Sequence, residues 1–256
     1  MLYPRIIPVL LVHDKGLVKT VKFKDHKYVG DPLNAVRIFN EKEADELVVL
    51  DIDATVEGRE PDFDMIGNLA SECRMPLCYG GGIRTLGQAK MILGLGVEKV
   101  AFSALFFEQP KLLTKLAEQV GKQSVVVVLD IKKKLFSGYE CFVHNGKKRT
   151  KISPVEAARE AERLGVGEIV INSIDNDGTM SGYDLDLINS IKSEVSVPVT
   201  AMGGVGSNDD IRALIEQEGI IGAAAGSHFV FKGKYRAVLI SYPNHEEKND
   251  MFSLTK

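Results

Sequence analysis

Cysteine is scarce in this chain of 256 residues, which has only Cys73, Cys78 and Cys141. They form no even set for disulfides and no CxxC pair, so we expect reduced thiols in a cytoplasmic protein. Positive charge is not in excess either, because the formal net charge is −3. A chain without a basic field is a poor nucleic-acid partner, so we expect none. No group of side chains indicates a metal or another cofactor.

Long apolar stretches are missing as well. No stretch approaches the roughly 20 residues that cross a bilayer. Residues 1–12 are too short for a signal peptide, and Pro8 interrupts them. No linker, low-complexity tract or charge block divides the sequence. We therefore expect one globular domain over residues 1–256 with no membrane partner, and this length suits an α/β barrel.

Eight short apolar runs are present, and segments with helical spacing lie between them. The runs are 6–12, 47–52, 76–79, 97–102, 125–129, 169–171, 197–201 and 220–225. The helical segments include 33–44, 86–95, 111–120, 155–164, 184–194 and 209–216. Ser153 before Pro154, and Ser207, are typical helix starts. Strand–helix alternation of this kind predicts a closed (β/α)8 TIM barrel.

An internal repeat divides the predicted barrel into two similar halves. Residues 75–83 match residues 197–205, because a proline, two glycines and an aliphatic residue recur 122 positions later. We therefore expect half-barrels at about 1–122 and 123–240. The alternative is chance similarity between strand–turn–helix units.

The fifth apolar run ends in a carboxylate, Asp130. A run that is apolar on both faces predicts a buried parallel strand. An acid at its carboxyl end lies where α/β barrels place their chemistry. The alternative is an aspartate that caps the next segment. Further acids follow strands two and six, and as a set they favour an acid–base site: Asp51, Asp53, Asp175 and Asp177.

Glycines follow strands three and seven, at 80–82 and at Gly203 and Gly204. Backbone N–H groups at such turns can approach an anion. Ser103 after strand four, and Gly226 and Ser227 after strand eight, could complete one site in each half. Two such sites predict a substrate with a phosphate at each end, although tight turns alone also require glycine.

A lysine-rich loop at 15–31 carries Lys19 and could close over an anionic substrate; the alternative is a solvated loop. At the opposite ends of the strands, Arg5, Glu46, Lys99 and Glu168 open strands one, two, four and six. Alternating charges there predict a structural salt-bridge ring, and the functional alternative is a gated entrance.

Together these motifs resemble the cyclase subunit of imidazole glycerol phosphate synthase. The most specific stretch is 173–184, Ser-Ile-Asp-Asn-Asp-Gly-Thr-Met-Ser-Gly-Tyr-Asp. The resemblance also rests on 5–7, 30–32, 45–48, 50–52, 80–83, 99–100, 124–127, Asp130 and 167–169, and it runs from residue 1 to about 231. The tail, 232–256, does not match the usual family ending.

The resemblance implies a lyase of histidine biosynthesis. A partner glutaminase forms a heterodimer at the amino-terminal face, and ammonia passes through the barrel to a ribulosyl aminoimidazole carboxamide nucleotide. The products are imidazole glycerol phosphate and aminoimidazole carboxamide ribotide. Asp130 is then an acid–base residue, and the four alternating charges are the ammonia gate. The implied substrate and phosphate contacts are Lys19, Asp51, Gly81, Gly82, Ser103, Asp177, Gly178, Gly203, Gly204, Gly226 and Ser227.

The chain departs from the family at Leu11, where a second catalytic aspartate is usual. Leucine cannot transfer a proton, and loss of such a group costs about 10²–10⁴-fold in rate. Asp14 is a conceivable substitute, but we expect it in the following loop. Ser103 replaces a usual asparagine, and Ala104 a usual hydroxyl residue.

Three hypotheses follow. The chain is a cyclase paralogue with weak or no activity, or it conducts ammonia from a glutaminase to a separate amidotransferase. Paralogues of the second kind are associated with forming an acetamidino sugar for surface polysaccharide. The third hypothesis is a related sugar-phosphate isomerase, and Leu11 argues against it because that enzyme also uses an aspartate there.

Overall fold

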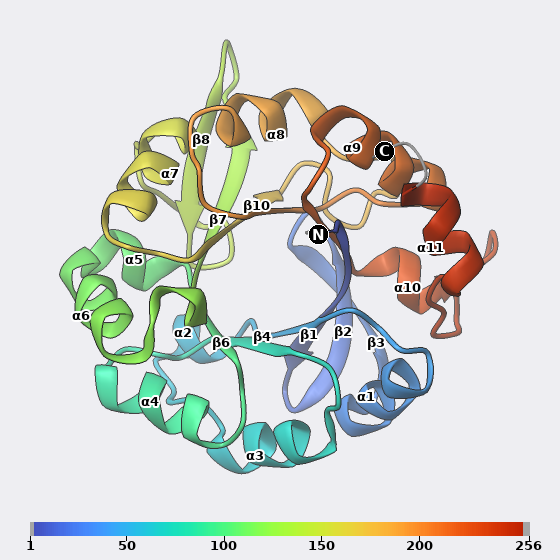
Figure 1. Cartoon of the computed structure of the whole chain (residues 1–256), viewed down its shortest axis with the longest axis horizontal. Helices are drawn as coiled ribbons and strands as arrows, with labels where there is room; N and C mark the ends of the chain where they lie inside the picture. Colours follow the sequence, from blue (N-terminus) through green and yellow to red (C-terminus); the bar gives the residue numbers. More distant parts are fainter. Residues whose placement is uncertain (1–2, 253–256) are drawn as a thin grey trace.

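Eight parallel strands form a closed barrel in the computed structural model, which describes residues 3–252 (Figure 1). The strands are β1 (Arg5–His13), β4 (Leu47–Asp51), β5 (Leu77–Gly80), β6 (Lys99–Phe102), β7 (Val125–Lys133), β10 (Glu168–Ser173), β11 (Val199–Met202) and β12 (Gly222–Ala225). Each pairs with the next in the order β1, β4, β5, β6, β7, β10, β11, β12, and β12 pairs with β1. The predicted (β/α)8 barrel is confirmed. In this closed order β1 and β7 lie opposite each other.

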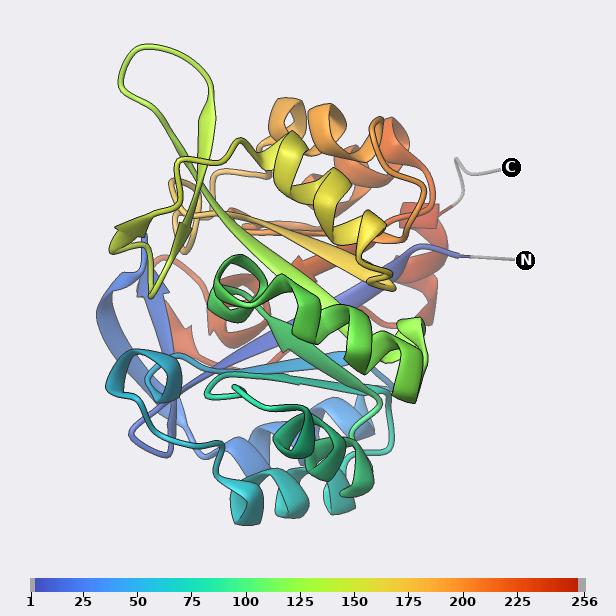
Figure 2. The ribbon, with the colours of Figure 1, turned by 90° about the vertical axis from the view of Figure 1, so that its left-hand side faces the viewer.

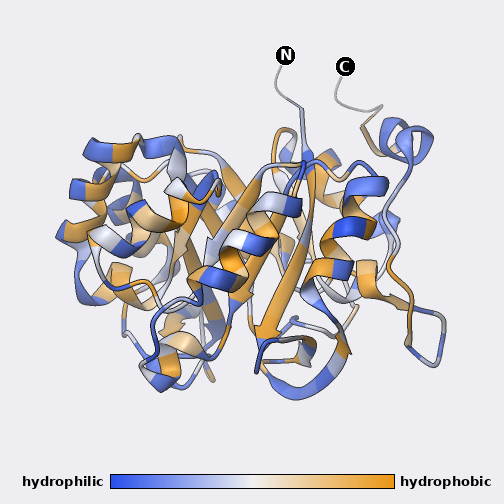
Figure 3. Ribbon diagram, turned by 90° about the horizontal axis from the view of Figure 1, so that it is seen from below, coloured by the Kyte–Doolittle hydropathy of each residue, from blue (hydrophilic) through white to orange (hydrophobic). Residues whose placement is uncertain are grey.

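Helices surround the barrel, and their polar faces point outward while the strands are apolar (Figure 3). The longer helices are α1 (Pro32–Glu41), α3 (Phe63–Glu72), α4 (Leu86–Gly94), α6 (Pro110–Val120), α7 (Pro154–Arg163), α8 (Leu185–Lys192), α9 (Asn208–Glu218) and α11 (His245–Phe252). Short turns of helix are α2 (Ala54–Glu57), α5 (Ala104–Glu108), η1 (Lys122–Ser124) and α10 (Ser227–Val230). Ser153 and Ser207 are N-caps, each in a capping box, as their sequence context predicts. Within residues 3–252, every helix is too short or too polar to cross a membrane.

Apolar side chains pack on both faces of the strands. The larger cluster lies between strands and helices and includes Ile6, Tyr79 and Phe229. A smaller cluster fills the barrel interior and includes Val126 and Val128, which alternate with the outward-facing Val125 and Val127. This explains why the barrel strands read as continuous apolar runs.

Two excursions at the carboxyl ends of the strands differ from the predictions. The expected loop at 15–31 is a hairpin of β2 (Gly16–Val21) and β3 (Lys24–Gly30), and β2 pairs with β1. The strand expected to end at Asp130 continues to Lys133 and pairs with β8 (Tyr139–Val143), which pairs with the short β9 (Lys148–Arg149). Both excursions project on the same side of the barrel, and β1 begins on the other (Figure 2).

The tail begins with a small hairpin of β13 (Phe231–Lys232) and β14 (Ala237–Val238) and ends in α11, which packs against α9. The Phe231 ring lies near two cations, with Lys27 Nζ 4.7 Å and Arg236 Cζ 4.9 Å from its centroid. The β2–β3 hairpin also contacts the tail, because Lys27 Nζ donates to the carbonyl oxygen of Arg236 at 2.9 Å. Residues 253–256 of the predicted tail lie outside the described residues.

Candidate active site

A cavity of about 330 Å³ opens at the carboxyl ends of the barrel strands. Its wall includes all twelve residues that were predicted as catalytic or substrate-binding: Lys19, Asp51, Gly81, Gly82, Ser103, Asp130, Asp177, Gly178, Gly203, Gly204, Gly226 and Ser227. They come from both halves of the chain and meet because parallel strands end at the same rim. The structure thus brings the predicted residues to one cavity, while their roles stay predictions.

Asp130 is held by two hydrogen bonds at the cavity wall. Ser103 Oγ donates to Asp130 Oδ2 at 3.2 Å, and Asn172 Nδ2 donates to Asp130 Oδ1 at 2.8 Å. Burial raises the pKa of Asp130 to about 6, although both hydrogen bonds act to lower it. A carboxyl group with this pKa can take up or release a proton near neutral pH.

Asn172 is a cavity residue that the sequence reasoning missed. It lies on β10 in register with Asp130 on β7. Its signal was an amide side chain directly after the apolar run Ile169 to Ile171. Its Oδ1 atom is buried and has no hydrogen-bond partner among residues 3–252. That oxygen is free to accept a hydrogen bond from a bound molecule.

Leu11 lines the cavity from β1, the strand opposite Asp130's strand β7. Val9 and Leu50 line the wall near it, and Leu11 is paired with Leu50. Asp14 does not replace the missing acid. It is exposed in the β1–β2 turn, and within the described chain it is not part of the cavity wall.

Lys19 reaches the cavity from the β2–β3 hairpin and is almost completely buried. Its ammonium group donates a hydrogen bond to the carbonyl oxygen of Val9. Burial lowers the pKa of Lys19 to about 8, and the nearby Asp177 opposes this shift. A Cβ atom at Gly226 would lie 3.0 Å from Lys19 Nζ, so the amine borders the glycine turn after β12.

Asp177 fastens the β2–β3 hairpin to the turn after β10. Its Oδ2 atom accepts from Thr20 Oγ1 at 2.7 Å and from the N–H of Phe23 at 3.2 Å. Its carbonyl oxygen accepts from the N–H of Lys22 at 2.9 Å. Burial raises the pKa of Asp177. This carboxylate, predicted as a substrate contact, therefore also holds the hairpin that carries Lys19.

The backbone conformation at residue 178 explains why this turn requires glycine. Its φ is +67°, in the left-handed region. A Cβ atom there would lie 1.9 Å from the carbonyl oxygen of Thr20. The hairpin can therefore approach the turn only because residue 178 has no side chain.

The predicted set of rim acids is only partly gathered in the cavity. Asp51 lines it, but its Oδ1 atom accepts the N–H groups of Asp53 and Ala54 at 2.9 Å each. Asp53 lies outside the wall formed by residues 3–252 and pairs with His13 Nδ1 at 2.9 Å. Asp175 is also outside that wall and accepts the N–H of Lys133. The prediction that Asp53 and Asp175 belong to the acid–base site was wrong, because both carboxylates bind neighbouring groups of the chain outside the cavity.

The turn after β8 adds His144 and Asn145 to the cavity wall, and neither was predicted. His144 Nε2 lies 3.0 Å from Glu108 Oε1, and Asn145 Nδ2 donates to the Ile52 carbonyl at 2.7 Å. Asn145 precedes Gly146, which is a turn signal, but only the fold places this turn over the barrel mouth.

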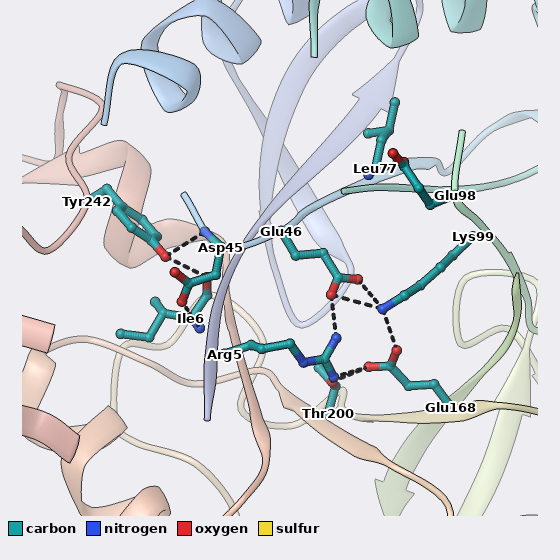
Figure 4. Close-up of polar contacts among 10 residues, drawn as sticks. All are labelled: Arg5, Ile6, Asp45, Glu46, Leu77, Glu98, Lys99, Glu168, Thr200 and Tyr242. Atoms are coloured by element: carbon teal, nitrogen blue, oxygen red, sulfur yellow. Dashed lines mark hydrogen bonds and ion pairs between the residues drawn. The ribbon is translucent and has the colours of Figure 1, made fainter. Parts of the chain in front are cut away.

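A ring of four charges closes the amino-terminal end of the barrel (Figure 4). Arg5 contacts Glu46, and Arg5 Nη2 donates to Glu168 Oε1 at 2.8 Å. Lys99 Nζ lies 2.8 Å from both Glu46 Oε1 and Glu168 Oε2. Thr200 Oγ1 adds a hydrogen bond of 2.6 Å to Glu168. The predicted ring of alternating charges therefore forms, with each cation between two carboxylates.

A small cavity of about 10 Å³ lies inside the barrel beyond the ring, roughly the space of one water molecule. Glu46 and Glu168 line it together with apolar side chains and Cys78. Five residues line both this cavity and the larger one: Val9, Leu50, Ala101, Val128 and Met202. These shared apolar side chains thus separate the small cavity beside the ring from the cavity that contains Asp130.

The chain is similar to known proteins over almost its whole length. The sequence model of the family described as histidine biosynthesis protein matches residues 5–236. Vibrio vulnificus has a protein provisionally named imidazole glycerol phosphate synthase subunit hisF3, 60% identical over 255 residues, 99% of this chain and 98% of its own. A Leptospira interrogans protein provisionally named as the HisF subunit is 56% identical over 253 residues, 98% of this chain and 100% of its own. The imidazole glycerol phosphate synthase subunit HisF of Lactococcus lactis is 41% identical over 218 residues, 85% of this chain and 84% of its own.

Proposed function

Because the chain belongs to the histidine biosynthesis protein family, as a divergent paralogue of the HisF subunits of imidazole glycerol phosphate synthase, we propose that it handles ammonia. A glutaminase binds at the amino-terminal face and releases ammonia at the charged ring. The barrel interior carries the ammonia to the cavity at the other face. The observation that carries this proposal is the closed ring of Arg5, Glu46, Lys99 and Glu168 at one end of an apolar interior shared with the Asp130 cavity.

An apolar interior selects for the neutral molecule. Ammonia can enter such a space without the large cost of burying an unpaired charge, whereas ammonium cannot. Glu46 and Glu168 are already paired with Arg5 and Lys99, so the ring offers an ammonium ion no unpaired carboxylate. An ammonium ion must therefore be excluded at the ring or lose its proton there. Ammonia therefore has to pass beside or through the ring, which acts as a gate.

The cavity at the other face is proposed to hold a ribulosyl aminoimidazole carboxamide nucleotide by its two phosphates. The turns at Gly81 and Gly82, with Ser103, form one contact. Gly178, Gly203, Gly204, Gly226 and Ser227 form the other, and Lys19 supplies positive charge beside it. Asp130 moves protons during ring closure and cleavage, since its pKa of about 6 suits exchange near neutrality.

Leu11 limits this chemistry. A leucine opposite Asp130 supplies no second acid–base group, and the missing group typically accounts for about 10²–10⁴-fold in rate. We therefore propose a cyclase activity that is weak. The products are imidazole glycerol phosphate and aminoimidazole carboxamide ribotide.

The purified chain, the ribulosyl nucleotide and an ammonium salt test this activity directly. We expect slow formation of imidazole glycerol phosphate that Asp130→Asn abolishes. A wild-type rate that is no greater than that of Asp130→Asn over hours would show that the cavity performs no cyclase reaction.

A second candidate is favoured by the combination of a complete ring with an altered cavity. Leu11 and Ala104 remove an acid and a hydroxyl from the wall, while all four ring residues are present. In this alternative the chain passes ammonia to a separate amidotransferase that forms an acetamidino sugar for surface polysaccharide. Purification of the tagged chain from its own cells distinguishes the two. A co-purified glutaminase without cyclase product favours the second, and absence of any glutaminase contradicts both.

A further inference from the structure

A side chain from the tail joins the two strands that carry half of the charged ring (Figure 4). The hydroxyl of Tyr242 donates to the Ile6 carbonyl oxygen at 2.8 Å and accepts from the N–H of Asp45 at 3.0 Å. Ile6 directly follows Arg5, and Asp45 directly precedes Glu46. Tyr242 therefore fixes the backbone immediately beside two of the four ring residues.

Asp45 completes this connection. Its Oδ2 atom accepts the N–H of Ile6 at 2.8 Å, and its Oδ1 atom accepts from Lys248 Nζ of α11 at 2.7 Å. The backbone N–H of Ile6 is thus bound by Asp45, and its C=O is bound by Tyr242. The tail contributes through Tyr242 directly and through Lys248 by way of Asp45.

At this level of the described chain β1 is paired with β12 but not with β4. Backbone pairing between β1 and β4 begins at Val9 and Val48, and within the described chain it does not extend down to Ile6 and Asp45. The strand starts that carry Arg5 and Glu46 are therefore held to each other by side chains. Removing the Tyr242 hydroxyl leaves a buried N–H and a buried C=O to find other partners.

Packing fixes Tyr242 in place. The residue is 8% exposed, and its ring centroid lies 5.4 Å from that of Phe229 and 6.4 Å from that of Phe39. Burial and the nearby Asp45 raise the pKa of Tyr242, so the phenol keeps its proton for Ile6. Its place in the chain lies beyond residue 236, where the match to the family ends.

The other half of the ring has a different support. Glu98, which precedes Lys99, accepts the N–H of Leu77 at 2.7 Å (Figure 4). This repeats the relation between Asp45 and Ile6, because a carboxylate beside a ring residue binds the start of the preceding strand. Only the half with Arg5 and Glu46 is also tied to the tail by the contacts described above.

We infer that Tyr242 is a positioning residue for the charged ring, holding Arg5 and Glu46 so that the ring stays closed over the barrel interior. Only the identity of the molecule that passes the ring, ammonia, rests on the proposed function. Closure itself is a matter of geometry and can be measured without ammonia, glutamine or a partner protein.

Cys78 provides the probe, because it lines the small cavity directly beyond the ring and is 2% exposed. Cys141 is also buried, but it lies on β8, paired with Ile131 near the other end of the barrel. In a Cys73→Ser background, methyl methanethiosulfonate converts each thiol to a methyl disulfide and releases methanesulfinate. Mass spectrometry of peptides follows the two thiols separately, so Cys141 reports general unfolding in the same molecule.

We expect Tyr242→Phe to raise the rate of Cys78 labelling about fivefold to tenfold relative to Cys141, since one buried hydrogen-bonding group is lost. Tyr183→Phe is the matched control. Tyr183 is also a buried tyrosine that donates to a strand carbonyl, that of Ala224, at 3.1 Å. It should leave the ratio of the two labelling rates unchanged.

The inference is overturned if Cys78 and Cys141 labelling rise together in Tyr242→Phe, or if neither changes. If Tyr242→Phe does not fold, Lys248→Met tests the same arrangement by removing the ammonium group that contacts Asp45, the Glu43 carbonyl and the Tyr242 ring. A raised ratio in that variant supports the inference, and an unchanged ratio contradicts it. A cyclase assay that fails would leave these results standing, so the two proposals fail separately.

Discussion

Asn172 Nδ2 lies 2.8 Å from Asp130 Oδ1, and the two residues are in register on β10 and β7, which are neighbouring parallel strands of the barrel. The amide donates to the carboxylate and thereby favours its ionised form. Burial has the larger effect and raises the pKa of Asp130 to about 6. The barrel thus keeps a buried acid whose charge changes just below neutral pH.

This has a consequence for stability. Because the pKa of Asp130 is about 6 in the folded chain and ordinarily 3.8, the folded state binds more protons between these values than the unfolded state does. Stability therefore falls as pH rises through that window, by up to about 3 kcal/mol. Asp130→Asn should be more stable than wild type in urea unfolding at pH 7.5, with the difference nearly gone at pH 4. Asp25→Asn, at an exposed position of β3, should change little at either pH. A less stable Asp130→Asn at pH 7.5 would contradict the expected cost of ionisation.

Leu11→Asp restores an acid opposite Asp130. We expect ammonium-dependent formation of imidazole glycerol phosphate to rise about 10²–10⁴-fold, the usual contribution of a positioned acid–base group. Leu11→Asn is the matched control, because asparagine has nearly the same shape as aspartate but cannot transfer a proton. Equal rates for the two variants would mean that the cavity has diverged in more than this one residue.

Lys19 should make anion binding depend on pH. Its pKa is about 8, lowered by burial, so its amine is charged below that pH and neutral above it. Binding of inorganic phosphate, measured by calorimetry, should weaken about tenfold between pH 7.5 and pH 9.5 as the positive charge is lost. Lys19→Met should bind phosphate weakly at both values. If wild-type affinity is the same at pH 7.5 and pH 9.5, Lys19 does not contact the anion.

Gly178→Ala should release the β2–β3 hairpin. Gly178 and Gly233 have similar φ values, +67° and +71°, but only at Gly178 would a Cβ atom meet another group, the Thr20 carbonyl at 1.9 Å. Both alanine variants bear the left-handed backbone penalty of about 1 kcal/mol. Gly178→Ala should lose about 1–3 kcal/mol more through overpacking and expose the hairpin to trypsin at Lys22. Equal stability and equal cleavage in the two variants would show that the hairpin does not depend on this close approach.

The barrel strands could be predicted because each is buried on both faces, which leaves a continuous apolar run in the sequence. The β2–β3 hairpin could not, since its lysines are typical of a solvated loop and Lys19 is buried only by the barrel mouth. The cavity residues at strand ends were predictable, because parallel strands share one rim. Asn172 was not, because its role depends on its register with Asp130.

The same reasoning explains why Asp51 was correctly placed in the cavity wall while Asp53 and Asp175 were not. Asp51, Asp53 and Asp175 all follow strands, and nothing in the sequence separates a carboxylate that faces the cavity from one that accepts backbone N–H groups. That choice is made by turn geometry, as in the bond from Lys133 to Asp175. The missing acid at Leu11 could be recognised only by comparison with the family pattern, because leucine is an ordinary residue in an apolar strand.

The bond between Tyr242 and Ile6 spans 236 residues of chain. The first barrel strand is therefore synthesised long before the residue that binds its beginning. Contacts of such long sequence separation form late and slow folding. A chain that stops short of Tyr242 leaves the Ile6 carbonyl and the Asp45 N–H without that partner. The backbone beside Arg5 and Glu46 can therefore reach its final arrangement only after synthesis has passed Tyr242.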